Sequence, residues 1–261
     1  MTSAVVERWG LEGDRRWMLV DSDGVAVTAR ECPRLVLVTP VLTAKGLLLT
    51  APGMSDLAVS HPPASTLVPV RVSDDAFEAV PAAEEASAWF SAWLERAVRL
   101  VYFDDPRRRA TNPSRSNAGD AVSFADGYPM LLASESSLGE LNGWVAEGAR
   151  AADGPVPMSR FRPNLVVSGA PAWAEDQWRR VRIGDVTFRA AKACERCVLT
   201  LVDPETSLKT KEPLYSLARH RQWDHKTWFA VNLLPDAAGA TLRVGDEVEV
   251  LQATSEPGPQ R

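Results

Sequence analysis

The stretch "AKACERCVLTLVDPETS", residues 191–207, contains two of the three cysteines in this chain of 261 residues. Cys194 and Cys197 are spaced C-x-x-C, and an apolar, β-branched run follows them from Val198 to Val202. Such a run predicts a β-strand. A redox-active C-x-x-C pair sits before a helix, whose dipole activates the thiol, so a following strand argues against that type of site.

Two other roles for the cysteine pair stay open on spacing alone. A structural zinc site needs four ligands, and the remaining candidates lie far away in the sequence: Cys32, His61, His220 and His225. Buried structural cysteines are common, so the pair could equally be packed thiols in a core strand. Three cysteines are too few for a disulfide framework. We expect free thiols, available as ligands or nucleophiles.

The composition is that of an ordinary soluble globular protein, with 45% hydrophobic and 24% charged residues. A formal net charge of −5 without a broad basic stripe argues against nucleic-acid binding. The N-terminus does not read as a signal peptide, and no apolar run reaches the roughly 20 residues that span a bilayer. We therefore expect a cytoplasmic protein with no membrane partner.

The first part of the chain predicts short antiparallel strands and one helix. Residues 17–50 alternate β-type runs with turns, among them Asp23-Gly24 as a hairpin turn and "PRLVLVTP" (33–40) as a strand. Residues 82–98 place tryptophans at helical spacing, with acids near the start, which predicts a helix with a buried tryptophan face. Residues 104–121 are polar and turn-rich and read as a surface loop.

The second part predicts a helix from about Glu135, followed by a β-barrel that is closed or nearly closed. Five β-type runs support the barrel: 164–169, 181–191, 197–202, 227–234 and 241–251. The predicted fold is thus mainly β with some α. We place an N-terminal β-barrel-like domain at 1–103, a C-terminal β-barrel at 104–251 and a disordered tail at 252–261.

Basic residues gather near the cysteines in the sequence. Arg196 lies between them, and "SRFRPN" (159–164) supplies Arg160, Arg162 and Asn164 before a strand. Arginine pairs well with phosphate, and a neighbouring cation stabilises a thiolate. Together they suit an anionic ligand that carries a phosphate and a soft metal centre. Alternatively, each arginine pairs with one of the many surface acids.

At these residues the chain resembles a known family. The MOSC domain is matched by "SFADGYPMLLASESSLGELN", "RFRPNLVVSG", "WAEDQWRRVRIGD" and "ACERCVLTLVDPETS" with "KEPLYSLARHR". The segment "LEGDRRWMLVDSDGVAVTARECPRLVLV" (11–38) resembles the β-barrel domain that precedes it in the mitochondrial amidoxime-reducing component and its bacterial relatives. The resemblance covers nearly all of the chain from Gly10 to Leu251.

The resemblance implies a molybdenum cofactor, with the second cysteine of C-x-R-C as the metal ligand. That residue is Cys197, which is also the expected catalytic residue. The residues that the family pattern places around the cofactor are Arg15, Arg162, Asn164, Glu195 and Arg196, with Asp126 and Gly127 at a pterin-facing turn. Asp203 would organise the loop behind Cys197, or simply form a turn before Pro204.

The resemblance implies reduction of N-hydroxylated compounds such as amidoximes and hydroxylamines. No ferredoxin domain follows Leu251, so we expect electrons from a separate ferredoxin-type or flavoprotein-type partner. Relatives begin with a Tyr-Pro-x-Lys-Ser-type strand that helps bind the cofactor phosphate. We expect this strand to be missing here, so that either translation starts upstream of Met1 or the site is incomplete. The alternative function is a non-catalytic carrier of the cofactor or of sulfur.

The family is also associated with pyridoxal phosphate, through fused cysteine desulfurases. The sequence shows no Schiff-base lysine in a supporting motif, so we do not expect direct use of that cofactor.

Overall fold

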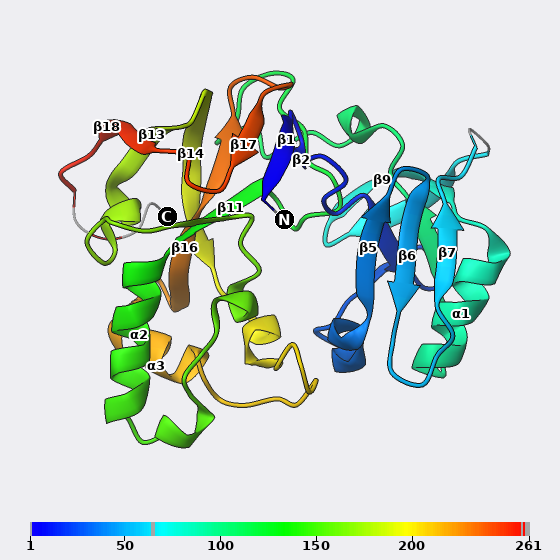
Figure 1. Cartoon of the computed structure of the whole chain (residues 1–261), viewed down its shortest axis with the longest axis horizontal. Coiled ribbons are helices and arrows are strands. Elements are labelled where there is room, and N and C mark those ends of the chain that lie inside the picture. The colour runs from blue at the N-terminus through cyan, green and yellow to red at the C-terminus, as the bar shows by residue number, and fades with distance from the viewer. Residues whose placement is uncertain (1, 64–65, 257, 259–261) are drawn as a thin grey trace.

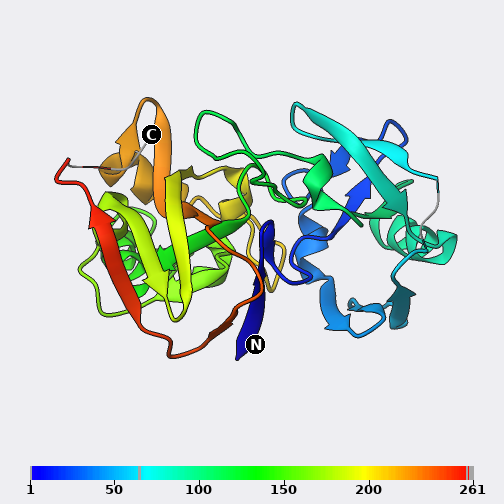
Figure 2. The same cartoon turned by 90° about the horizontal axis from the view of Figure 1, so that it is seen from above.

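The computed structural model describes residues 2–63, 66–256 and 258. Two domains lie side by side, the N-terminal one coloured blue to cyan and the C-terminal one green to red (Figure 1). Strand β1 (Ser3–Glu7) lies between them, as Figure 2 shows. It pairs with β2 (Gly10–Leu11) and with β17 (Thr241–Arg243), so the first strand is joined to the last part of the chain.

The N-terminal domain contains a curled five-stranded sheet in the order β4-β3-β10-β9-β8. A parallel bridge between Val25 and Arg71 joins the two ends of this order. A second sheet has the order β5-β6-β7. The strands are β3 (Trp17–Val20), β4 (Ala26–Val27), β5 (Thr39–Thr43), β6 (Gly46–Thr50), β7 (Leu57–Ser60), β8 (Val68–Val72), β9 (Asp75–Pro81) and β10 (Arg99–Tyr102).

The predicted turn at Asp23-Gly24 is confirmed between β3 and β4. Gly24 has φ +75°, and its amide donates to the carbonyl of Asp21 at 3.1 Å. A Cβ at this position would lie 2.5 Å from the carbonyl oxygen of Pro69. Glycine is therefore needed both for the left-handed backbone and for the close approach of β8.

The predicted tryptophan-bearing helix is confirmed as α1 (Glu84–Leu94), which ends at Glu95 in the left-handed conformation. Trp89 and Trp93 are buried. Trp89 packs with Phe90 in the core cluster formed with Leu19, Leu47, Leu49, Val59 and Leu100. The face was predictable because the apolar residues repeat with the helical period, while the acids at the start suit the helix dipole.

The C-terminal domain is built on a curled sheet in the order β12-β11-β16-β14-β13-β18. All neighbours are antiparallel except β11 and β12. Helices α2 and α3 pack against one face, through Leu141, Val145 and Leu217. The strands and α-helices are β11 (Met130–Ser134), α2 (Glu135–Glu147), β12 (Leu165–Val167), β13 (Trp178–Ile183), β14 (Val186–Glu195), α3 (Leu214–His220), β15 (Gln222–Trp223), β16 (Lys226–Pro235) and β18 (Val248–Ala253).

The opposite face of this sheet holds the main core of the domain. Phe188, Leu132, Leu233 and Met130 are at most 1% exposed and pack with Val6 of β1 and Leu242 of β17. The mainly β fold with two barrel-like domains is therefore confirmed. Helix α2 begins at Glu135, as predicted, with Ser134 as its N-cap.

Two runs that the sequence predicted as strands form 3₁₀ turns instead. In residues 33–40, Pro33 opens η1 (Pro33–Leu37), because its fixed φ suits the first position of a helical turn, and the strand β5 starts only at Thr39. Residues 198–201 form η6 (Val198–Leu201), whose backbone is held by local and side-chain hydrogen bonds rather than by a neighbouring strand. The remaining turns are η2 (Pro106–Arg108), η3 (Ala151–Asp153), η4 (Met158–Phe161) and η5 (Ala174–Gln177).

The predicted disordered tail at 252–261 is wrong for its first residues. Gln252 and Ala253 belong to β18, and the amide of Thr254 donates to the carbonyl of Gln177 at 2.9 Å. Residues 257 and 259–261 of the expected tail lie outside the described residues. Within the part of the chain that the structure describes, no helix is both long and apolar enough to span a membrane.

The buried face of the C-terminal sheet predicts a large difference between two truncations. Phe188→Ala removes a side chain that is 0% exposed and should lower the free energy of unfolding by about 3–5 kcal/mol. Leu251→Ala, at a residue that is 43% exposed, should cost well under about 1 kcal/mol. Urea unfolding of the two variants measures the difference, and equal losses would contradict this assignment of the core.

Candidate functional site

Cys197 lies where the chain leaves the C-terminal sheet. Strand β14 ends at Glu195, the amide of Arg196 still donates to the carbonyl of Thr227 at 2.8 Å, and Cys197 then caps η6. The Cys197 carbonyl accepts bonds from the amide and the hydroxyl of Thr200, at 3.1 and 2.9 Å. The side chain itself is exposed. The backbone of Cys197 is thus anchored, while the thiol is open to solvent.

Arg30, from the segment after β4, reaches Cys197 across the domain boundary. Its Nε donates to Cys197 Sγ at 3.3 Å, and its guanidinium forms an ion pair with Asp126. Burial alone would lower the pKa of Arg30, but the Asp126 carboxylate and the hydrogen bond to Cys197 raise it above its usual range. The Arg30 carbonyl accepts from Lys209 Nζ at 3.4 Å. The cation beside the thiol therefore comes from the N-terminal domain.

Arg15 and Asn164 link the two domains a second time. Arg15 donates to the carbonyl of Arg162 at 3.1 Å and to Asn164 Oδ1 at 3.4 Å, and it pairs with Asp14. Asn164 Nδ2 donates to Asp14 at 2.7 Å, and its Oδ1 accepts from the amide of Leu131 at 3.0 Å. The Asn164 amide is therefore occupied by protein partners, and it helps to position Arg15.

Arg162 presents a guanidinium that makes no direct ion pair within the described ranges, although the carboxylates of Asp14 and Asp126 lie near enough to favour its charged form. Its side chain is exposed, and no described residue forms an ion pair or side-chain hydrogen bond with its guanidinium. Desolvation by the surrounding protein, and then the nearby charge of Arg15, lower the pKa of Arg162, and Arg30 adds to this effect. Arg15 pairs with Asp14 and Arg30 with Asp126, so the three arginines outnumber the two carboxylates, and the net positive charge left at the junction favours an anion. Arg15 and Arg162 both have left-handed backbones, with φ 50° and 54°.

The structure directs Glu195 and Arg196 away from Cys197. Glu195 forms an ion pair with Lys226 at 2.8 Å, on a strongly exposed part of the surface. Arg196 donates to Cys194 Sγ at 2.8 Å and to the carbonyl of Phe161 at 3.0 Å. The charge expected beside Cys197 is therefore supplied by Arg30, and Arg196 serves the other cysteine.

Asp126 and Gly127 lie at the same domain junction. The Asp126 side chain is 67% exposed and faces Arg30. A Cβ on Gly127 would meet nothing within 4 Å, so the space there does not require glycine.

Arg160 and Asp203 hold the turn that follows Cys197. Arg160, which is 5% exposed, donates to the carbonyls of Thr200 and Leu201 at 3.3 and 2.7 Å, and to Asp203 at 3.1 Å. The Asp203 carboxylate also accepts hydrogen bonds from the backbone amides of Glu205 and Thr206. Although burial opposes it, these backbone bonds lower the pKa of Asp203. Arg160 is therefore committed to the loop and is not a free anion ligand.

Sequence reasoning missed Arg30 as a site residue. It lies in the N-terminal segment that resembles the family, but no local feature marks it, because its partner Cys197 is 167 positions away. Across the described ranges, no group of three or more His, Cys, Asp or Glu side chains is placed to hold a metal ion.

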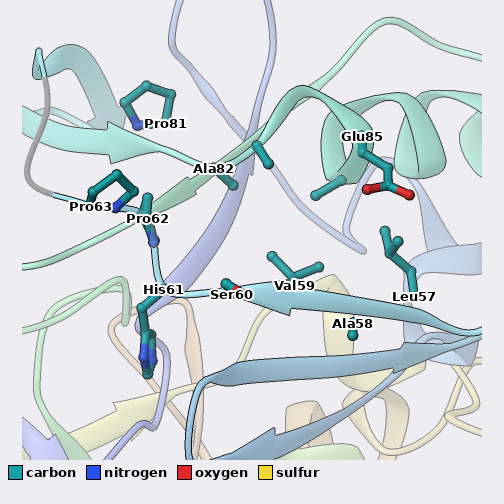
Figure 3. A pocket seen from close by; sticks show the side chains of 12 residues that line it. Leu57, Ala58, Val59, Ser60, His61, Pro62, Pro63, Pro81, Ala82 and Glu85 are labelled. Atoms are coloured by element: carbon teal, nitrogen blue, oxygen red, sulfur yellow. The ribbon is translucent and has the colours of Figure 1, made fainter.

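Two cavities lie elsewhere on the molecule. One, of about 420 Å³, lies between β7 and the start of α1, lined by Leu57, Val59, Pro62 and Glu85 among others (Figure 3). The other, of about 820 Å³, runs along β12 and β17 and includes Asn164 at its edge. Neither is lined by Cys197 or Arg30. The candidate site is therefore the exposed domain junction at Cys197.

Comparison with known proteins gives matches over both domains. Residues 1–97 match the model of the MOSC N-terminal beta barrel domain, and residues 119–249 match the MOSC domain. The chain is 35% identical over 258 residues to mitochondrial amidoxime-reducing component 1 of Mus musculus, covering 94% of this chain and 74% of that protein. It is 37% identical over 258 residues to mitochondrial amidoxime reducing component 2 of Rattus norvegicus, covering 92% and 74%. For component 1 of Homo sapiens the identity is 33% over 253 residues, covering 91% and 73%.

The contacts of Arg160 predict that it keeps the Cys197 turn closed. Arg160→Met removes the Arg160 hydrogen bonds to the carbonyls of Thr200 and Leu201 and to Asp203, and leaves the Leu201 carbonyl with Thr210 as its donor. We expect amide hydrogen exchange in residues 198–206 to become about tenfold faster or more, because such losses are worth about 1–3 kcal/mol each. Arg162→Met is the matched control and should leave exchange in that segment unchanged. Equal exchange in the two variants would show that Arg160 does not hold the turn.

Proposed function

The chain belongs to the MOSC domain family, and on this basis we propose that it is a molybdenum-cofactor-dependent reductase of N-hydroxylated compounds. The observation that carries the proposal is the exposed Cys197 thiol, which receives a hydrogen bond from Arg30 at the junction of the two domains. Amidoximes and hydroxylamines are the proposed substrates, with amidines and amines as products.

The residues at the junction fit the cofactor. A thiolate is a soft ligand and suits a thiophilic metal centre, so Cys197 would hold the molybdenum. Arg162 is an exposed residue whose guanidinium makes no direct ion pair with a described residue, and Arg15 and Arg30 lie close enough to lower its pKa. Guanidinium groups bind phosphate well, so Arg162 would hold the phosphate of the pterin. Asn164 would act by orienting Arg15 and the backbone of Arg162.

The division of work follows from these positions. When bound, the cofactor would supply the redox chemistry that removes the nitrogen-bound oxygen, with electrons from the partner protein. The chain keeps Cys197 accessible, places Arg30 beside its sulfur and holds the following turn through Arg160. Glu195 and Arg196 have no side-chain contact with this arrangement, because they bind Lys226 and Cys194.

Electrons would come from a separate electron-transfer protein of ferredoxin or flavoprotein type. The names of the relatives describe them as mitochondrial components of amidoxime reduction. For this chain, a cytoplasmic location stays a prediction.

The exposed Cys197 would also serve a carrier that binds the cofactor without turnover. Molybdenum analysis of the purified protein, combined with turnover of benzamidoxime by an artificial reductant, separates the two functions. Bound molybdenum without turnover would favour the carrier.

Different roles for the two cysteines predict different effects of substitution. Cys197→Ser should remove most bound molybdenum and abolish benzamidoxime reduction, because the proposed metal ligand is lost. Cys194→Ser should keep the metal and substantial activity, since Cys194 is half-buried against Phe161 and Phe229 and contacts Arg196. Metal analysis and activity assays give the answer, with far-ultraviolet circular dichroism as the test of folding. Metal loss only in Cys194→Ser would reassign the ligand, and equal loss in both would indicate a two-cysteine site.

The Arg162 guanidinium, which makes no direct ion pair in the described part of the chain, predicts a second difference. Arg162→Ala should weaken cofactor retention about tenfold or more, as expected for loss of a charge-assisted contact worth about 1.5–3 kcal/mol. Arg182→Ala is the control, because Arg182 pairs with Glu249 on a well-exposed part of the sheet. Molybdenum per chain after gel filtration measures both. Equal retention would contradict a phosphate contact at Arg162.

A further inference from the structure

We propose that Arg109, which no motif singles out, is a positioning residue for Cys197 and acts through Asp126 and Arg30. The inference rests on the proposed function insofar as Cys197 is the metal ligand. Arg109 lies in the segment between the two domains, directly after η2, and is 3% exposed. A buried arginine in a connecting segment needs several partners to offset its desolvation.

Those partners are the backbone of one loop. Arg109 Nη1 donates to the carbonyls of Ser123 and Ala125, at 2.6 and 2.5 Å, and Nη2 donates to the carbonyl of Asp126 at 3.0 Å. One guanidinium thus donates hydrogen bonds to three carbonyls within four successive residues. The planar fork of arginine fixes the directions of these bonds, so the loop is held in one shape.

The remaining donors of Arg109 bind the N-terminal barrel. Its Nε and Nη2 both donate to Asp75 Oδ2, at 3.1 and 2.8 Å, and Asp75 is the first residue of β9. All five N–H groups of the guanidinium therefore have an acceptor. Through Arg109, the loop 123–126 is fastened to the same domain that supplies Arg30.

The loop ends at the site. Arg109 holds the backbone carbonyl of Asp126, while the Asp126 side chain pairs with Arg30, which donates to Cys197 Sγ. Each link is a direct contact, and among the described residues the Asp126 side chain forms its hydrogen bond and ion pair with Arg30 alone. Without Arg109, three carbonyls of the loop lose the N–H groups that donate to them. Asp126 is then no longer held opposite Arg30, and Arg30 loses the group that orients it toward the sulfur.

A purely structural role for Arg109 would give the same loss of stability, so the test must read Cys197 itself. We would measure alkylation of Cys197 by iodoacetamide in the metal-free full-length protein, by peptide mass spectrometry, with Cys194 and Cys32 as internal references. The variants are Arg109→Met, Asp126→Asn and the double variant. Arg109→Met should slow Cys197 alkylation about threefold to tenfold, because Arg30 is then no longer held beside the sulfur and a neighbouring cation promotes thiolate reactivity. Asp126→Asn provides the background in which the effect of Arg109→Met is measured again.

The double variant decides between the two roles. If Arg109 acts through Asp126, adding Arg109→Met to Asp126→Asn should slow Cys197 no further, since residues in one chain of contacts have non-additive effects. Independent, multiplied effects would overturn the proposal, as would equal changes at Cys194 and Cys32. Arg109→Lys, which keeps the charge with fewer donors, should give an intermediate rate and carries the test if Arg109→Met does not fold.

A matched control comes from the same region. Arg189 pairs with Asp120 at 2.9 Å and with Asp236 at 2.7 Å, away from Asp126. Arg189→Met should lower the melting temperature and leave Cys197 alkylation unchanged. Because alkylation needs no metal, the result is independent of the proposed function. If the double-mutant cycle is non-additive but the protein retains no molybdenum, the proposed reductase function is wrong and Arg109 is still a positioning residue for Cys197.

Discussion

The site depends on one contact between domains, the hydrogen bond from Arg30 to the sulfur of Cys197. Each domain has hydrophobic clusters of its own. Two clusters are formed mainly by the N-terminal domain, and two lie on the opposite faces of the C-terminal sheet. Without the N-terminal domain, Cys197 would lack the Arg30 hydrogen bond, and its sequence neighbour Arg196 bonds to Cys194 instead. The cation arrives only when the N-terminal domain is in place, so the relative position of the domains is part of the chemistry.

The sequence predicted those elements whose signal is local. Helix α1, the turn at Gly24 and the start of α2 at Glu135 follow from apolar period, turn chemistry and capping, which act within a few residues. The run 198–201 misled the prediction, because its β-type residues are held in a turn by Arg160, about 40 positions away. A long-range partner overrode a local preference.

The site was predictable only in part, for the same reason. The family pattern named Cys197, Arg15, Arg162 and Asn164 as site residues, and the structure brings these four to the domain junction. Arg196 was expected beside Cys197 because it precedes it in sequence. However, neighbouring residues at a strand end point in different directions, and Arg196 lies over the ring of Phe161 and bonds to Cys194. Residues that are adjacent in the sequence therefore need not have side chains in contact. Arg196 does not bond to Cys197, but Arg30 from the other domain does.

Two of the three cations at the junction sit on unfavourable backbone. Arg15 and Arg162 have φ of 50° and 54°. Residues other than glycine and asparagine rarely adopt this backbone region, which costs of the order of 1 kcal/mol or more. Asparagine at either position would relieve this cost and remove a charge. Directed evolution for heat resistance alone would therefore drift toward neutral residues at 15 and 162, and a screen for thermostable variants needs a parallel selection for ligand binding to keep the site.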